Sequence, residues 1–275
     1  MNKLSPRPAI TIVANRVNRC QTSSINAAKD GRRMGKNWCD KLSFSIFPAR
    51  CLLCEASSAL SVELCYNCLS LLRRQSPYCR HCGLNLPDTH NDCGRCLQQP
   101  PAFDRCISGC DFHRLSAALI HRFKDHKQLP PLRILSTLLA DEILQSYCDE
   151  TLPQLIIPVP LHWQRLWTRG FNQSQWIAHA LSQQLNIPIS NHGVKRLYAT
   201  PQQRKLNKRQ RLGNLKDAFQ VTADYSRYQH IAIVDDVITT GSTAQGMALQ
   251  LKQHGVPVVD CWSLARTPEP GSRDG

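Results

Sequence analysis

Short apolar runs alternate with helical hydrophobic spacing along the second half of the chain. The runs at residues 155–159 and 231–234 are rich in branched apolar side chains, which predicts strands buried on both faces of a parallel sheet. Apolar residues at helical spacing predict helices over residues 115–123, 132–147, about 172–185 and 244–253. The pattern therefore predicts an α/β fold in which helices flank a parallel sheet.

Two acids and a hydroxyl-rich turn follow the second apolar run. Asp235 and Asp236 come at the carboxyl end of the predicted strand, where ligands bind in open α/β sheets. The turn after them consists of Thr239, Thr240, Gly241, Ser242 and Thr243. We expect Ser242 or Thr243 to cap the next helix. Carboxylates accept hydrogen bonds from sugar hydroxyls but repel phosphate, whereas backbone N–H groups at a helix start bind phosphate. The segment predicts a site for a phosphorylated sugar, and the alternative, an ordinary capped turn, leaves both acids unexplained.

This segment resembles the phosphoribosyl diphosphate (PRPP) loop of type I phosphoribosyltransferases, in which an apolar strand, two acids and two spacers precede Thr-Thr-Gly-x-Thr. The resemblance implies that Asp235 and Asp236 accept hydrogen bonds from the ribose hydroxyls and that residues 239–243 hold the 5-phosphate. Mg²⁺ is the expected partner of the PRPP oxygens, because it prefers hard oxygen ligands and commonly bridges phosphate groups.

Two basic segments are candidates for contact with the diphosphate. The loop after residue 159 contains Arg169 and Gly170 before a predicted helix, and such a loop suits an anion. Arg169 is the expected catalytic partner of the two acids. A second segment, residues 195–216, carries cations and no acid. In the enzymes that this region resembles, the equivalent loop closes over the substrate; a merely solvated loop is the alternative. The residues expected to act from this mobile loop are Arg204, Lys205, Lys208, Arg209 and Arg211.

Eight of the fourteen cysteines form four CxxC pairs, and the pattern CxxC-x10-CxxC occurs twice at an offset of 28 residues. Two CxxC turns can complete one tetrahedral zinc site, so the pattern predicts two structural zinc ions. The expected ligands are Cys51, Cys54, Cys65, Cys68, Cys79, Cys82, Cys93 and Cys96. We expect consecutive pairs to share an ion; crossed pairing, disulfides and an iron–sulfur cluster are the alternatives. The remaining six cysteines are expected to be buried small hydrophobes or tail residues.

Four features in one order resemble the ComF family: the cysteine modules, Phe123-Lys124 after a helix, the RGFNQ loop that begins at Arg169, and the VDDVITTG segment. The resemblance covers roughly residues 45 to 267. It implies a double zinc ribbon at 45–100, a phosphoribosyltransferase-like domain at 101–267 and a role in handling incoming DNA. Residues 1–44 are expected to form a disordered basic tail, of which residues 1–33 precede Met34 and could be untranslated; residues 268–275 form a second tail.

The net charge of +14 suits polyanionic partners but does not choose among metabolites, nucleic acid and anionic membranes. No stretch approaches the ~18 apolar residues that span a bilayer, and no signal peptide is evident, so we expect a cytoplasmic protein. Three functions stay open. The first is a PRPP-binding protein in DNA uptake or in use of DNA as nutrient, with single-stranded DNA and DNA-uptake proteins as candidate partners. The others are an active phosphoribosyltransferase with an unknown acceptor and a zinc-dependent DNA-binding or interaction scaffold.

Overall fold

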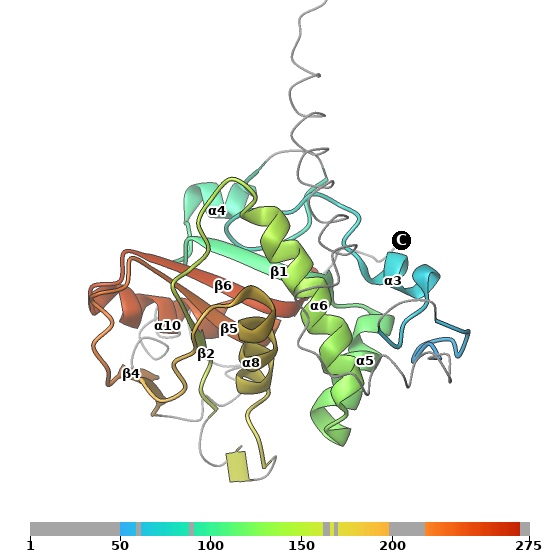
Figure 1. Ribbon diagram of the computed structural model, residues 1–275. Coiled ribbons are helices and arrows are strands. Elements are labelled where there is room, and N and C mark those ends of the chain that lie inside the picture. Colours follow the sequence, from blue (N-terminus) through green and yellow to red (C-terminus); the bar gives the residue numbers. More distant parts are fainter. Residues whose placement is uncertain are drawn as a thin grey trace, which may run out of the picture.

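A parallel sheet of four strands, in the order β1-β6-β5-β2, forms the centre of the larger domain (Figure 1). The computed structural model describes residues 50–58, 62–87, 91–161, 166–167, 170–197 and 218–269. The strands are β1 (Arg105–Asp111), β2 (Leu155–Pro158), β5 (His230–Ile238) and β6 (Val258–Arg266). β5 pairs with β2 on one side and with β6 on the other, which explains its uninterrupted apolar run.

Helices cover both faces of this sheet. On one face α5 (Arg114–His126), α6 (Leu129–Ser146) and α8 (Gln173–Leu185) share a buried cluster with Ala232 and Val234 of β5. On the other face α10 (Ser242–Gln253) packs with Ile231 and Ile233. The same cluster includes residues of β3 (Val194–Arg196) and β4 (Phe219–Val221), which form a small antiparallel pair. Adjacent residues of β5 thus face opposite helical layers, as a strand's period of two requires.

The expected fold class is confirmed, and all four predicted helices form. The predicted strand at 231–234 is longer than expected, because β5 stays paired with β6 as far as Ile238. Asp235 and Asp236 therefore lie within the last part of β5 rather than after it. The apolar pattern did not predict β1 or β6, since both carry polar residues that only the tertiary structure satisfies. Ser108 of β1 and Ser263 of β6, for example, are fully buried with their hydroxyl oxygens 2.7 Å apart.

The two cysteine modules pack on the larger domain in different ways. The first module, which includes α3 (Tyr66–Leu72), contributes Leu64 and Leu72 to the same buried cluster as α5 and α6. The second module, which includes α4 (Gly94–Gln98), has a small cluster of its own around Leu84. The limits expected from the sequence, 45–100 and 101–267, stay predictions. In the described part of the chain, no helix combines the length and the hydropathy needed to cross a bilayer.

Candidate functional site

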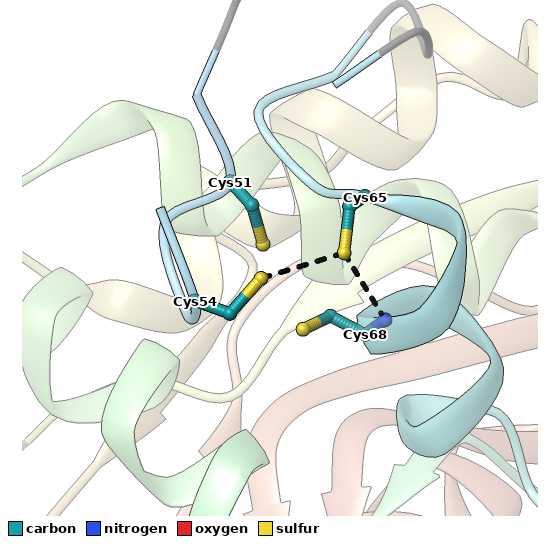
Figure 2. A group of neighbouring side chains, drawn as sticks. All are labelled: Cys51, Cys54, Cys65 and Cys68. Atoms are coloured by element: carbon teal, nitrogen blue, oxygen red, sulfur yellow. Dashed lines mark hydrogen bonds between the residues drawn. The ribbon is translucent and has the colours of Figure 1, made fainter. Parts of the chain in front are cut away.

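Eight cysteine thiols meet in two groups of four. The first zinc module brings together Cys51, Cys54, Cys65 and Cys68, and Figure 2 shows their sulfur atoms converging from a loop and from the start of α3. The second zinc module brings together Cys79, Cys82, Cys93 and Cys96. Within each group all sulfur atoms lie within 4.8 Å of one another, so consecutive CxxC pairs meet and crossed pairs do not.

The sulfur spacing fits zinc. The Sγ atoms of Cys54 and Cys65 are 3.6 Å apart, and those of Cys82 and Cys93 are 3.7 Å apart. A tetrahedral ion with Zn–S bonds of about 2.3 Å has S–S edges of about 3.8 Å, whereas a disulfide bond measures about 2.05 Å. Burial raises the pKa of Cys51, but hydrogen bonds from the backbone of Cys65, Leu53 and Cys54 outweigh burial and lower that pKa to about 6. The thiolate needed for metal binding is therefore favoured at this position.

Among the described residues, the cysteines outside the two modules belong to no such cluster. Cys106, Cys110 and Cys261 are fully buried in the core, as expected of small hydrophobes. The expectation was wrong for Cys148, which is exposed, because it lies just after the end of α6 rather than inside the helix. Cys20 and Cys39 lie outside the described residues.

Asp235 is the inner of the two acids on β5. Its Oδ1 accepts hydrogen bonds from the Ser174 hydroxyl at the start of α8, at 3.2 Å, and from the backbone N–H of Asp236, at 2.8 Å. Burial, and then the neighbouring charge of Asp236, raise the pKa of Asp235 to about 7. A hydroxyl donor or a cation brought by a ligand would stabilise its ionised form.

Asp236 points to a different partner. Its Oδ2 lies 2.7 Å from the Nζ atom of Lys124 on α5, and both side chains are mostly buried. Lys124 therefore compensates one of two adjacent carboxylates, which would otherwise repel each other. The expected site residues Asp235 and Asp236 thus stand next to each other on β5 but contact different partners.

Residues 239–243, called the hydroxyl turn below, connect β5 to α10. Gly241 has φ +75° and is the residue that precedes the helix, which begins at Ser242. The expected cap at Ser242 or Thr243 is wrong, because Gly241 occupies the capping position and has no side chain to cap the helix. Glycine adopts this left-handed backbone at little cost. The Thr240 hydroxyl oxygen instead accepts from the N–H of Ser242, at 3.4 Å, and Thr240 donates to the Ser242 hydroxyl, at 3.1 Å. Thr239 and Thr240 are exposed.

The loop before α8 approaches the same edge of the sheet. Asn172 caps α8 by accepting from the N–H of Ser174, at 3.0 Å, and its amide donates to the carbonyl oxygen of Val159, at 3.0 Å. Gly170 has φ +76°, and a Cβ atom added there would come within 3.4 Å of the Lys127 ammonium. The Lys127 ammonium therefore lies next to the backbone of this loop. Arg169 and all five residues of the expected mobile loop lie outside the described residues.

Residues 42–97 match the model of the double zinc ribbon domain family. Competence protein F of Haemophilus influenzae (strain ATCC 51907 / DSM 11121 / KW20 / Rd) is 37% identical to this chain over 227 residues, which cover 81% of this chain and 99% of that protein. The chain belongs to the ComF family. DNA utilization protein YhgH of Escherichia coli (strain K12) is 37% identical over 223 residues, covering 80% of this ComF chain and 98% of YhgH. Competence protein ComFC of Bacillus subtilis (strain 168) is 24% identical over 224 residues, covering 74% and 89% respectively.

Solved structures similar to this ComF chain include phosphoribosyltransferases. An adenine phosphoribosyltransferase from Leishmania tarentolae has a TM-score of 0.32 and 11% identity, covering 52% of this chain and 73% of that one. A hypoxanthine phosphoribosyltransferase from Staphylococcus aureus has a TM-score of 0.30 and 12% identity, covering 52% and 67%. At these TM-scores the likeness assigns no residue of the site.

Two residues of the ComF site were missed as site residues by sequence reasoning. Ser174 lies near the start of the predicted helix, where a serine is typical of a capping residue, so nothing in the sequence indicated another role. Only the fold brings its hydroxyl to Asp235. Lys124 was noted as part of the Phe123-Lys124 pair, but nothing local links it to Asp236. The available signal for Lys124 was its place next to the apolar Phe123 near the end of a predicted helix.

Proposed function

We propose that this ComF protein binds PRPP together with Mg²⁺ at the carboxyl end of β5 and acts in the uptake or use of DNA. One observation carries the proposal: two carboxylates near the end of β5 are followed directly by the hydroxyl turn, in which Gly241 immediately precedes α10. Asp235 and Asp236 would accept hydrogen bonds from the ribose hydroxyls. The N–H groups of the hydroxyl turn, at the positive end of the α10 dipole, would receive the 5-phosphate.

The donor set at this edge of the sheet fits Mg²⁺. Asp235 and Asp236 offer hard oxygen ligands. Burial and the charge of Asp236 raise the pKa of Asp235 in spite of the nearby Lys124 ammonium, so a further cation would stabilise the ionised form of Asp235. When bound with PRPP, Mg²⁺ neutralises part of the diphosphate charge. Lys124 and Lys127 would supply positive charge from the protein, and Arg169 and the basic loop are proposed to do the same from outside the described residues.

Calorimetric titration of the zinc-loaded chain with Mg-PRPP tests this function. Micromolar or tighter binding is expected, and ribose 5-phosphate, which lacks the diphosphate, should bind more weakly. Asp236→Asn should weaken PRPP binding, because an amide cannot replace an acceptor-only carboxylate. Absence of heat with intact, metal-loaded wild-type protein would overturn the proposal.

Phosphoribosyl transfer is a second candidate function, favoured by the pKa of Asp235. A carboxyl group that titrates at about 7 can take up or release a proton at neutral pH, as acid–base catalysis requires. The acceptor is not specified by the described residues. PRPP-dependent release of diphosphate, lost in Asp235→Ala and Asp236→Ala, is the expected outcome for an enzyme. Tight PRPP binding without diphosphate release across purine, pyrimidine and amine acceptors would favour a binding protein.

The DNA part of the proposal is supported by the printed names of the relatives and by the charge of +14. Reduced cysteine modules fit the cytoplasm, where thiols persist, and we propose that location. Binding of single-stranded DNA through phosphate contacts should weaken steeply as salt rises. Fluorescence anisotropy with a labelled oligonucleotide at several salt concentrations measures this dependence, and an affinity that ignores salt would contradict it.

A further inference from the structure

Arg266 joins the second zinc module to the hydroxyl turn. It ends β6, is only 3% exposed, and lies in register between Asp111 of β1 and Ile238 of β5. Its Nε atom donates to the carbonyl oxygen of Cys82, at 2.8 Å, and its Nη1 atom donates to the carbonyl oxygens of Ile238, at 3.1 Å, and Thr239. One buried guanidinium therefore contacts both a metal-ligating residue and the first residue of the turn.

These hydrogen bonds hold the carbonyl groups that precede two backbone donors of the turn. In a trans peptide the N–H group points opposite to the C=O group of the preceding residue. Because the carbonyls of Ile238 and Thr239 point at Arg266, the N–H groups of Thr239 and Thr240 point away from it. Thr239 and Thr240 lie on the exposed side of the turn. The Ile238 carbonyl oxygen also accepts from the backbone N–H of Thr267, at 3.0 Å, so Arg266 shares the orientation of the Thr239 N–H with Thr267. The orientation of the Thr240 N–H depends more directly on Arg266, through the carbonyl oxygen of Thr239.

The second module is held firmly at this edge of the sheet. Arg74, whose side chain is 2% exposed, donates to the carbonyl oxygen of Gly83, at 2.7 Å, and pairs with Asp111, at 3.1 Å. Gly83 has φ +70°, and a Cβ atom there would lie 2.9 Å from the sulfur of Cys106. Two consecutive carbonyls, those of Cys82 and Gly83, are therefore each bound by an arginine. A zinc ion with four thiolates carries net negative charge, which favours these arginines beside it.

The first module has no equivalent connection in the described residues. Its hydrogen bonds go to helices instead: Arg122 of α5 donates to the carbonyl oxygen of Leu52, at 2.8 Å, and Arg133 of α6 pairs with Glu63, at 2.6 Å. The two modules have the same ligand set and the same spacing, so they form a natural comparison. Among the residues that the structure describes, only the second module is connected to the turn through one residue.

We propose that Arg266 is a positioning residue through which metal loading of the second zinc module sets the geometry of the hydroxyl turn. Loss of that metal releases the Cys82 carbonyl, lets Arg266 move, and leaves the Thr240 N–H without a fixed direction. Anion binding at the turn then weakens even though no residue of the turn has changed. The inference rests on the proposed function only for the identity of the anion.

Amide hydrogen exchange of the ligand-free full chain tests the coupling, read by mass spectrometry on peptides that contain residues 238–243. Cys93→Ser removes the third thiolate of the second module, and Cys65→Ser removes the equivalent thiolate of the first; both cysteines are partly buried. Cys93→Ser should raise exchange of the hydrogen-bonded amides of the turn about tenfold, the effect of losing a hydrogen bond to a charged group. One such amide is the Ser242 N–H, which donates to the Thr240 hydroxyl oxygen. Cys65→Ser should leave it within about twofold. Equal effects of the two variants would overturn the coupling.

Arg266→Lys provides the second arm, because lysine keeps the charge but lacks the fork that reaches both carbonyl groups. With both zinc ions retained, this variant should raise exchange in the turn by itself. Adding Cys93→Ser to Arg266→Lys should raise exchange in the turn no further, since both changes break the same connection between the second zinc module and the turn. Additive effects would overturn the proposal. If Cys93→Ser does not fold, Arg266→Lys decides alone: exchange raised only in the turn supports the coupling, and exchange unchanged or raised throughout the sheet contradicts it.

Calorimetry separates this inference from the proposed function. Arg266→Lys should weaken Mg-PRPP binding by about the same tenfold, because the same oriented donors are lost. A wild-type chain that does not bind Mg-PRPP overturns the proposed function, while the exchange data still decide the coupling. If the wild-type chain binds Mg-PRPP but Cys93→Ser leaves amide exchange in the turn unchanged, only the coupling is overturned.

Discussion

Lys124 on α5 and Asp236 on β5 form an ion pair of 2.7 Å at the carboxyl end of the sheet. The side chains are only 19% and 18% exposed, so solvent screens the pair weakly. Asp235 stands directly beside this pair with its pKa raised to about 7 by burial and by Asp236. The pair thus determines how much negative charge the site carries before a ligand arrives.

Replacing Lys124 by methionine should weaken Mg-PRPP binding at least about tenfold at pH 7. Without the ammonium, the two adjacent carboxylates share a proton and accept fewer hydrogen bonds from the ribose hydroxyls. The loss should shrink as pH rises and both acids ionise. Unfolding should become easier by about 1–3 kcal/mol. Calorimetry at pH 6.5 and 8.5, with denaturant unfolding, measures both effects. Arg114→Met, which removes a cation from the other end of α5, is the control and should change neither.

The raised pKa of Asp235 predicts a pH-dependent stability. The folded chain holds this proton more tightly than the unfolded chain, whose aspartate has a pKa of about 3.9, so the contribution of Asp235 to stability falls as pH rises from about 4 to 7. The slope should approach 1.4 kcal/mol per pH unit at most, and should flatten above about pH 8.

Asp235→Asn removes this titration, so the difference in unfolding free energy between wild type and variant should shift in favour of the variant from pH 6 to 8. Zinc-loaded protein and this pH window keep metal loss out of the comparison. A difference that does not vary with pH would show that Asp235 titrates normally.

Gly241→Ala should destabilise the chain by about 1 kcal/mol, the cost of a left-handed backbone for a residue with a Cβ atom. The added carbon itself fits, since the nearest atom, on Phe103, is 3.5 Å away. PRPP affinity should fall as well, because the turn must change shape to relieve the strain. Gly94→Ala, at the start of α4 with open space around it, is the matched control. It should be neutral or slightly stabilising in thermal unfolding.

Metal analysis should give about two zinc ions per chain, and a ratio of about one would contradict the two-module arrangement. Cys65→Ser should lower the thermal midpoint more than Cys93→Ser. The reason is that the first module places Leu64 and Leu72 in the main core, whereas the second has its own small cluster. Calorimetric melting of the two variants measures the difference. Equal midpoints would show that the shared core does not depend on the first metal.

Local chemistry made the two kinds of site predictable. CxxC spacing specifies which thiols are near each other, and the structure pairs them consecutively. The acids and hydroxyls of residues 235–243 are contiguous, so their succession needs no tertiary information. The helix cap was mispredicted because a hydroxyl and a glycine at neighbouring positions both suit a helix start, and only the backbone angle of Gly241 decides between them.

The sequence by itself determined the α/β class, the two four-cysteine groups and the acid pair before the hydroxyl turn, because each depends on a spacing that can be read within one segment of the chain. Only the tertiary structure decided that Lys124 faces Asp236, that Ser174 faces Asp235, and that Arg266 reaches a carbonyl group 184 positions away in the second zinc module. Such contacts depend on which strand ends lie at one edge of the sheet. Hydrophobic periodicity reports whether a residue is buried, but it carries no information about which distant residue it meets.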